Sequence, residues 1–186
     1  MRIGIDIDST LHNYWDQFSA IVLERHGIHL PYEGQETWHI EQLSPEEVSE
    51  VIAATHSEPH VSDAVPYEGA VETINRWADD GHFIHITSHR TTDAHDATAA
   101  WLESIGLQFD ELYCSYDKIT RCREIGIELL VDDSPVNIER AIGEGITAAT
   151  ILHPWNREVC ARLPVVAADD WPGLSAELDT YFSTAS

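Results

Sequence analysis

Basic residues are scarce in this sequence, which has 10 lysines and arginines against 33 aspartates and glutamates and a formal net charge of −23. Only one of the ten is a lysine, Lys118. A charge of this sign repels a nucleic-acid backbone unless a local basic groove overrides it, and no cluster of Lys or Arg supplies one. Long nucleic acids are therefore not expected partners, and the position of the single lysine needs a reason.

Cysteines and long apolar runs are also rare. The three cysteines form no Cys-x-x-Cys pair, and their odd number argues against a disulfide framework or a structural zinc site. No apolar run approaches the roughly 20 residues that span a membrane. Residues 1 to 7 already resemble a strand, with no basic and apolar leader before them. We therefore expect a cytoplasmic protein without a membrane segment.

The length favours one α/β core with an insertion, because 186 residues are few for two domains of ordinary size. A hydrophobic fraction of 43% and six tryptophans can fill such a core. A first strand is expected at residues 2 to 7. Helices are expected over roughly residues 11 to 60, one of them beginning with Ser44 as its N-cap.

From Pro66 onwards, strands and helices alternate in short units. Expected strands lie at 83–87, 111–114, 127–132 and 147–151, and expected helices at 68–80, 91–105, 118–125, 135–143 and 171–182. Such alternation with short loops predicts a parallel sheet with right-handed crossovers and helices on its faces.

Polar residues follow the strands of this predicted sheet. In an open parallel sheet, ligands bind outside the carboxyl ends of the strands, so these residues are the candidates for a site. They are Asp6, Asp8, Thr87, Ser88, Lys118, Asp132 and Asp133. Carboxylates, hydroxyls and an ammonium group together suit phosphoryl transfer, which needs a nucleophile, donors for the phosphoryl oxygens and a metal to offset the clustered anions.

Each of these signals has a structural alternative when taken alone. An Asp-x-Asp pair occurs often by chance, Thr87 and Ser88 can simply cap a helix, and Ser134 with Pro135 can begin one. A phospho-accepting receiver module also combines acidic residues, a threonine and a lysine on a parallel sheet. Motif order argues against the receiver, because here the Asp-Asp pair follows Lys118 rather than preceding it.

Four segments resemble the motifs of the haloacid dehalogenase (HAD) superfamily of phosphatases: IGIDIDSTL, IHITS, Lys118 and LLVDDSP, in that order. The chain is most similar to the 5′-nucleotidase, deoxyribonucleotidase type C group, and the run HPWNR after the last expected strand belongs to the likeness. The resemblance implies a HAD-like core at residues 1–11 and 67–186, with a small helical cap inserted after the first strand at residues 12–66.

The resemblance also implies a role for each motif residue. Asp6 would be the nucleophile that forms an aspartyl phosphate, and Asp8 the general acid and base. Mg²⁺ would be held by Asp6, the backbone carbonyl of Asp8 and Asp132, with Asp133 orienting a bound water. The substrate phosphate would contact Thr87, Ser88 and Lys118, and Lys118 would also restrain the nucleophile as a carboxylate.

Two positions depart from the nucleotidase group. Ser9 stands where that group commonly has glycine, and His89 and Arg90 follow the second motif where deoxyribonucleotidases usually continue differently. Arg90 can be interpreted as a ligand for phosphate or for a second anionic group of the substrate, or as a surface residue at a helix entry.

The expected cap is rich in aromatic residues, namely Tyr14, Trp15, Phe18 and Trp38. Tyr14 occupies the place of a base-packing aromatic in the deoxyribonucleotidases, so it is a candidate for stacking on a nucleobase. The alternative is that the aromatic stripe only joins the cap to the core. Three histidines, His82, His85 and His89, lie along one expected strand and its exit and are interpreted as structural residues rather than metal ligands.

The expected activity is hydrolysis of small phosphomonoesters with Mg²⁺ as cofactor and a nucleoside or deoxynucleoside 5′-monophosphate as the preferred substrate. Sugar phosphates and the terminal phosphates of nucleic acids are the alternatives that keep the chemistry. A non-catalytic phosphate-binding module is the alternative without hydrolytic chemistry. The sequence leaves the oligomeric state open, with a homodimer as one option.

Overall fold

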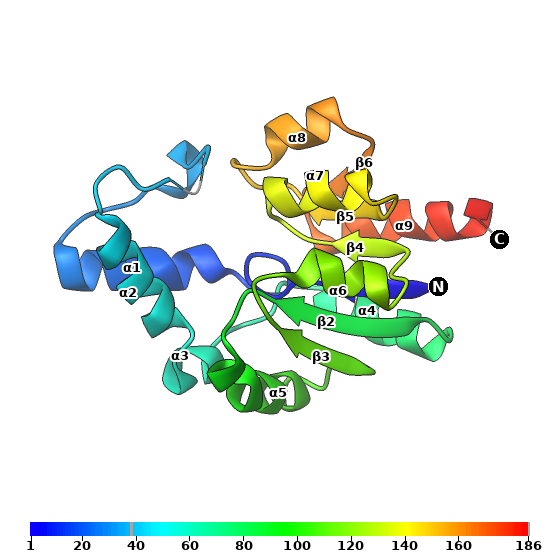
Figure 1. The fold of residues 1–186 in the computed structure, drawn as a ribbon, viewed down its shortest axis with the longest axis horizontal. Coiled ribbons are helices and arrows are strands. Elements are labelled where there is room, and N and C mark those ends of the chain that lie inside the picture. The colour runs from blue at the N-terminus through cyan, green and yellow to red at the C-terminus, as the bar shows by residue number, and fades with distance from the viewer. Residues whose placement is uncertain (38, 186) are drawn as a thin grey trace.

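The computed structural model describes residues 1–37 and 39–185, and a parallel sheet forms its centre (Figure 1). In the described chain the sheet has six strands in the order β3-β2-β1-β4-β5-β6. The strands are β1 (Arg2–Ile5), β2 (Phe83–Ser88), β3 (Glu111–Cys114), β4 (Leu129–Val131), β5 (Thr147–Ile151) and β6 (Val165–Ala168). The parallel α/β architecture expected from the alternating pattern is confirmed.

Strand β1 lies in the middle of the sheet because both of its edges are paired. Ile5 pairs with Ile86 of β2 and with Val131 of β4, so β1 and β4 end at the same level and β2 continues through Thr87 and Ser88. The ladder continues one step further, where the Asp6 N–H donates to the Val131 carbonyl at 2.9 Å. This register brings the residues that follow the three strands to one edge of the sheet.

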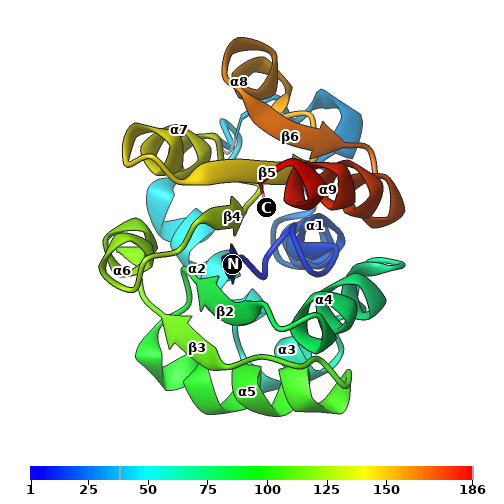
Figure 2. The ribbon, with the colours of Figure 1, turned by 90° about the vertical axis from the view of Figure 1, so that its right-hand side faces the viewer.

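Helices cover both faces of the sheet (Figure 2). On one face lie α6 (Lys118–Glu124), α7 (Pro135–Gly143) and α8 (Arg157–Arg162), and on the other α4 (Ala70–Asp79), α5 (His95–Ser104) and α9 (Trp171–Ala185), with η2 (Thr92–Ala94) leading into α5. The α4 and α9 side holds the larger apolar cluster, in which the rings of Trp77 and Trp171 lie 6.0 Å apart. Burial on both faces explains why β1 and β4 are continuous apolar runs.

A further set of helices follows β1 and precedes β2 along the chain, and it projects to one side of the sheet (Figure 1). It consists of α1 (Tyr14–His26), η1 (Tyr32–Gly34), α2 (Pro45–Thr55) and α3 (Glu58–Ser62). These helices share an apolar cluster that includes Trp15, Phe18 and Val51, and Trp155 of the core packs into it. Trp38, one of the aromatics expected in the cap, lies outside the described residues.

Several boundaries differ from the expectations. The expected helix at 91–105 divides into η2 and α5, and the strand expected at 127–132 narrows to Leu129–Val131. Helix α8 and strand β6 were not expected at all. Strand β6 is the short run VVAA, half-buried at the edge of the sheet, and such a segment has too few large side chains to give a periodic signal. No helix among the described residues is long and apolar enough to cross a membrane.

Helix α2 begins with a complete capping box, as expected from the sequence. The Ser44 hydroxyl accepts from the Glu47 N–H at 3.2 Å, and the Glu47 carboxylate accepts from the Ser44 N–H at 2.7 Å. We predict that Ser44→Ala lowers the free energy of unfolding by about 1 kcal/mol, or about 2–4 °C in Tm. Ser44→Asp keeps the acceptor and should remain near wild type. Equal thermal stability of all three proteins would contradict this prediction.

Candidate active site

The ammonium group of Lys118 lies between two carboxylates at the carboxyl edge of the sheet. Its Nζ is 2.7 Å from Asp6 Oδ1 and 2.7 Å from Asp132 Oδ2. Asp6 follows β1, Asp132 follows β4, and Lys118 opens α6 after β3, so three separate loops meet at this point. All three side chains are buried. The only lysine of the chain is therefore the counter-ion of the two carboxylates.

Burial and mutual charge shift the pKa values in this cluster. Burial raises the pKa of Asp6 to about 7, and the neighbouring carboxylate of Asp132 adds to the rise, although Lys118 opposes it. The pKa of Asp133 is raised well above its usual range, again mainly by burial and by its acidic neighbours. Burial alone would lower the pKa of Lys118, but Asp132 and Asp6 raise it, so the lysine stays charged.

Three buried carboxylates can share a cation here. Asp6, Asp132 and Asp133 each offer an oxygen, and these oxygens lie within 4.8 Å of one another. Mg²⁺ prefers oxygen ligands and octahedral geometry, and it commonly uses a few carboxylates together with waters and substrate phosphate. One lysine cannot neutralise three carboxylates, so the donor set fits a divalent cation.

The two aspartates of the Asp-Asp pair have different surroundings. Asp132 accepts from the Ser134 N–H at 2.9 Å and from the Asn137 amide at 3.1 and 3.2 Å, in addition to its ion pair with Lys118. Both of its oxygens are thus engaged. Asp133 Oδ2 accepts from the Trp155 indole N–H at 2.9 Å. Asp133 therefore has more capacity for a cation than Asp132, which differs from the roles expected from the resemblance.

The end of β2 supplies two buried hydroxyls. Within the described part of the chain, neither Thr87 Oγ1 nor Ser88 Oγ has a hydrogen-bond partner. Buried hydroxyls are usually paired, and an orphan beside a cluster of charges indicates a missing ligand. Both residues lie where the sequence placed them, at the carboxyl end of the strand next to β1. Their hydroxyls are suitable donors for phosphoryl oxygens.

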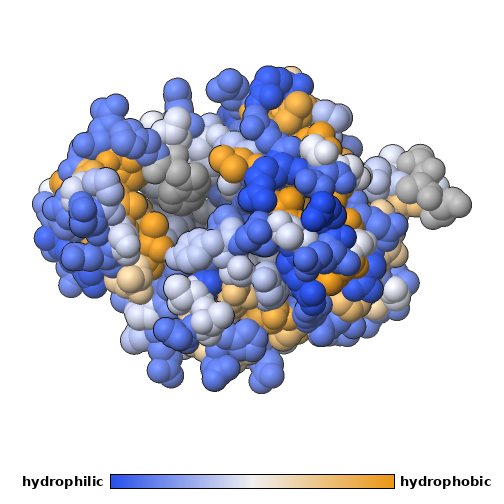
Figure 3. All heavy atoms as spheres, viewed as in Figure 1, coloured by the Kyte–Doolittle hydropathy of each residue, from blue (hydrophilic) through white to orange (hydrophobic). Residues whose placement is uncertain are grey.

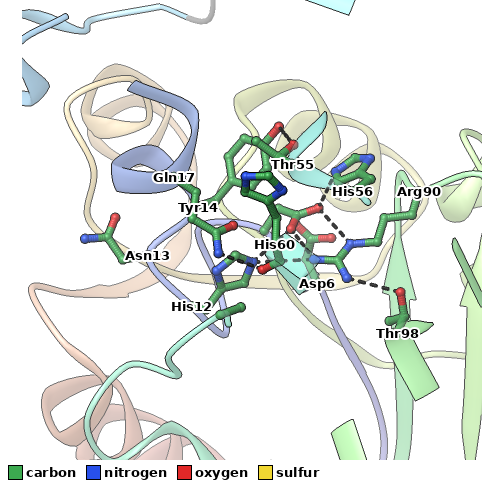
Figure 4. A network of polar contacts seen from close by, with 12 residues as sticks. Asp6, His12, Asn13, Tyr14, Gln17, Thr55, His56, His60, Arg90 and Thr98 are labelled. Atoms are coloured by element: carbon green, nitrogen blue, oxygen red, sulfur yellow. Dashed lines mark hydrogen bonds and ion pairs between the residues drawn. The ribbon is translucent and has the colours of Figure 1, made fainter. Parts of the chain in front are cut away.

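Asp8 lies among the basic side chains of His12, His56 and Arg90, which Figure 4 labels. Its Oδ1 is 2.6 Å from Arg90 Nη2 and 3.0 Å from His12 Nε2, and its Oδ2 is 3.3 Å from His56 Nε2. Burial by itself would raise the pKa of Asp8, but the charge of Arg90, the hydrogen bond from His12 and the nearby His56 ring hold that pKa well below its usual range. Asp8 is a firmly ionised carboxylate in this arrangement, whereas Asp6 is not.

Arg90 is not the surface residue that one interpretation of the sequence suggested. It is 1% exposed, and its guanidinium group is bonded to Asp8 and, through Nη1, to Thr98 Oγ1 at 3.1 Å. The alternative role as an anion ligand for the substrate would require this pair to open. His12 and His56, which complete the surroundings of Asp8, were not expected from the sequence because no motif marks them.

A cavity of about 980 Å³ opens from this cluster between the α1–α2 helices and the core. Asp6, Asp8 and Asp133 line it, as do two apolar side chains of α2, Val48 and Ile52. The surface is hollowed there, with apolar side chains at the edge of the hollow (Figure 3). The volume lies within the range of small-molecule sites, roughly 300–1,000 Å³.

The expected aromatic and histidine residues fall in different places. Tyr14 lines the cavity but is 5% exposed, and its hydroxyl is 2.9 Å from Thr55 Oγ1. Trp15 and Phe18 lie in the apolar cluster of the inserted helices. His89 also lines the cavity. His82 contacts the N-terminal amine, and His85 lies 3.5 Å from Glu111 inside the sheet region.

The loop after β5 contributes residues that the sequence indicated only as part of the HPWNR likeness. His153 Nε2 is 2.8 Å from the Ser9 carbonyl, and Trp155 donates to Asp133. The Asn156 amide donates to the Asp133 carbonyl at 3.2 Å, and its oxygen accepts from the His153 N–H at 2.8 Å. This loop therefore binds both the segment after β1, at Ser9, and the segment after β4, at Asp133. The sequence alone did not indicate these contacts.

Mg²⁺ should stabilise the protein more at pH 8 than at pH 6. The Asp6 pKa of about 7 lies above its value of 3.8 in an unfolded chain, so the folded protein holds a proton there at pH 6. Binding a cation displaces that proton, which weakens binding as the pH falls through 7. The Tm should be measured with Mg²⁺ and with a chelator at each pH, and the difference between the two values compared. Effects of histidine titration on Tm are common to both samples and cancel in this difference. An equal or larger Mg²⁺ shift at pH 6 would contradict the prediction.

Comparison with known proteins identifies the family of the chain. The family model "5′ nucleotidase, deoxy (Pyrimidine), cytosolic type C protein" matches residues 1–172. A curated protein of Chlorobaculum tepidum, a proposed 5′(3′)-deoxyribonucleotidase, is 26% identical over 170 residues, which cover 84% of this chain and 81% of that protein. The match spans both the sheet and the inserted helices.

Solved structures share the fold at low sequence identity. A HAD-superfamily hydrolase from Ehrlichia chaffeensis is 14% identical with a TM-score of 0.63 and covers 97% of each chain. The D,D-heptose 1,7-bisphosphate phosphatase from B. bronchiseptica, solved with magnesium and phosphate, is 11% identical with a TM-score of 0.58, covering 97% of this chain and 98% of that one. These structures share the fold of this chain. The family match over residues 1–172 shows that the chain belongs to the 5′-nucleotidase, deoxy, cytosolic type C family and is a phosphoric monoester hydrolase.

Proposed function

We propose that this protein is a Mg²⁺-dependent nucleotidase that hydrolyses nucleoside 5′-monophosphates, deoxynucleotides among them, through an aspartyl phosphate on Asp6. The observation that carries the proposal is the position of Asp6. Its carboxylate lies 2.7 Å from Lys118 and lines a cavity of about 980 Å³. Asp6 follows Ile5 just as Thr87 follows the paired Ile86 on β2, and the Thr87 hydroxyl has no hydrogen-bond partner among the described residues. A phosphate at that point would meet a nucleophile, an ammonium group and a hydroxyl donor together.

Asp6, Asp133 and the Asp8 carbonyl are our candidates for holding Mg²⁺, with Asp132 reserved for Lys118. This assignment exchanges the roles first expected for Asp132 and Asp133, because both oxygens of Asp132 are already engaged and Asp133 Oδ2 accepts only from Trp155 among the described contacts. When bound, Mg²⁺ would neutralise the carboxylates and polarise the phosphoryl group. The related structure solved with magnesium and phosphate supports the choice of metal.

In the first step, a carboxylate oxygen of Asp6 attacks phosphorus as the bond from phosphorus to the leaving oxygen breaks. Lys118 and Thr87 donate to the phosphoryl oxygens, and Asp8 gives a proton to the departing alcohol. In the second step, Asp8 takes a proton from water, which attacks the same phosphorus and releases inorganic phosphate and the free Asp6 carboxylate. Over the two steps one proton passes from water to the departing alcohol, and Asp8 regains the proton that it gave.

The contacts of Asp8 set a condition on this sequence. Arg90, His12 and His56 favour the ionised form of Asp8, which suits its action as a base but not as an acid. To donate a proton in the first step, Asp8 must leave Arg90 and face the leaving oxygen. His56 follows α2 of the inserted helices, so a shift of those helices would alter the contacts of Asp8. We infer that residues 12–66 form a cap whose movement changes the contacts of Asp8.

We predict that Asp6→Asn lowers Mg²⁺-dependent release of phosphate by at least about a thousandfold. The amide is a poor nucleophile but has nearly the same shape, so the fold should persist. Phosphate release from an aryl phosphate, together with the circular dichroism spectrum, provides the measurement. Asp96→Asn alters an exposed carboxylate on α5 and serves as the control. Turnover of Asp6→Asn near that of the control would overturn the assignment of the nucleophile.

The cavity supports a nucleotide as substrate because it carries an exposed aromatic ring close to the phosphate site. Tyr116 is 67% exposed, lines the cavity and precedes Lys118 by two residues. Its ring stacks with that of His89, with centroids 6.0 Å apart and an angle of 22° between planes. Val48 and Ile52 of α2 line the same cavity. We propose that the base lies against Tyr116 rather than against the buried ring of Tyr14.

Tyr116→Ala should raise KM for a deoxynucleoside monophosphate about tenfold, the typical worth of one base–aromatic stack. It should leave KM for deoxyribose 5-phosphate, which has the same sugar and phosphate without a base, unchanged. Tyr14→Ala should lower turnover of both substrates alike, because Tyr14 holds Thr55 and packs within the cap. A selective loss of nucleotide turnover in Tyr14→Ala alone would instead assign the base to Tyr14.

The family supports a cytoplasmic location, which we adopt as part of this proposal. A sugar phosphatase would become the better interpretation if the wild-type protein hydrolysed deoxyribose 5-phosphate as efficiently as the nucleotide.

A further inference from the structure

Ser9 has an unusual backbone conformation in the turn that follows Asp8. Its φ is 59°, and it is the one residue other than glycine with positive φ in the described chain. The left-handed region is unfavourable for residues with a Cβ atom, and glycine occupies it readily. Ser9 is also 1% exposed, and its hydroxyl has no hydrogen-bond partner among the described residues. Contacts elsewhere must therefore stabilise this conformation.

Three consecutive carbonyls of the turn accept hydrogen bonds from distant segments. The Ser9 carbonyl accepts from His153 Nε2, the Thr10 carbonyl from the Trp171 indole and the Leu11 carbonyl from the Tyr67 N–H, each at 2.8 Å. His153 binds the carbonyl that is nearest to Asp8 in sequence. These three bonds tie the turn to distant segments, in addition to the local bonds to the Ile7 carbonyl, and of the three only the bond from His153 acts on Ser9 itself.

The donor role of His153 follows from its partners. A carbonyl can only accept, so Nε2 must carry the proton that points to Ser9. Burial lowers the pKa of His153 to about 4, so the ring is neutral and Nδ1 is an acceptor. The Tyr32 hydroxyl lies 2.7 Å from Nδ1 and therefore donates to it. The ring also stacks on Trp155, with centroids 4.6 Å apart and planes within 2°.

Fixing the Ser9 carbonyl also fixes the peptide that carries the Asp8 carbonyl. The Ser9–Thr10 peptide is held on its carbonyl side by His153 at 2.8 Å and on its N–H side by the longer bond from the Thr10 N–H to the Ile7 carbonyl at 3.2 Å. The φ and ψ of Ser9 relate the plane of this peptide to that of the Asp8–Ser9 peptide. If Ser9 relaxed to a right-handed conformation, the Asp8–Ser9 peptide would turn. The Asp8 carbonyl, a candidate metal ligand, would then point elsewhere.

We propose that His153 is a positioning residue whose hydrogen bond to the Ser9 carbonyl holds the left-handed turn and thereby aims the Asp8 carbonyl at the metal site. The inference rests on the proposed Mg²⁺-dependent function. It predicts that a serine at position 9 makes the enzyme depend on His153, whereas a glycine would adopt the same turn without help. Tyr32, from the inserted helices, supports the ring through its second nitrogen.

The test is a double-mutant cycle between positions 9 and 153, with Mg²⁺ affinity measured by isothermal titration calorimetry. His153→Leu removes the donor and should weaken Mg²⁺ binding about tenfold or more, as loss of an outer-shell contact commonly does. His153→Gln offers an amide N–H at a similar reach and should restore most of the affinity. In the Ser9→Gly background, His153→Leu should have little effect on Mg²⁺ affinity.

Trp171→Phe is the matched control, because it removes a hydrogen bond to the next carbonyl of the same turn. It should lower the Tm, and Ser9→Gly should not change its effect on Mg²⁺ affinity. Thermal unfolding with a chelator shows whether each variant folds. Equal losses from His153→Leu in the wild-type and Ser9→Gly backgrounds, or an unchanged affinity in His153→Leu, would overturn the positioning role alone. Failure of the wild-type protein to bind Mg²⁺ would overturn the proposed function as well.

Discussion

The placement of one buried ammonium group between two carboxylates is the constraint on which the rest of this structure depends. Removing water from Lys118, Asp6 and Asp132 is costly, and the cost is offset only while the distances stay near 2.7 Å. Loss of one partner from such a buried pair typically costs about 3–5 kcal/mol. The parallel sheet meets this demand, because strands in register end at the same level and deliver charges from three separate loops to one point.

The surrounding loops serve mainly to hold this edge in place. Asn137 and the Ser134 N–H bind Asp132, while Trp155 binds Asp133. These donors satisfy oxygens that would otherwise lie buried without partners. They also make the surroundings of Asp132 and Asp133 unequal. Both oxygens of Asp132 are engaged, one of them by Lys118, whereas Asp133 accepts from Trp155 through one oxygen. A cluster with the same residues but without these contacts would have no reason to assign different tasks to adjacent aspartates.

The sequence predicts the sheet and the principal charges well for a physical reason. Strand ends, turn residues and the isolated Lys118 are local signals, and a parallel sheet converts local position into spatial proximity. The partners of Asp8 could not be predicted in this way. His12, His56 and Arg90 reach it from three segments, and their meeting depends on how the inserted helices pack. The short strand β6 and the different contacts of Asp132 and Asp133 depend equally on tertiary structure.

Asp6 and Asp8 show how far tertiary structure can separate two identical side chains one residue apart. Burial beside Asp132 raises the pKa of Asp6 to about 7, whereas the charge of Arg90 keeps the pKa of Asp8 well below its usual range. A carboxyl group that titrates near neutral pH and one that stays ionised differ in their chemistry, and their surroundings cause the difference. The Asp-x-Asp motif therefore specifies two carboxylates, and Lys118 and Arg90, both from distant parts of the chain, set the charge that each one carries.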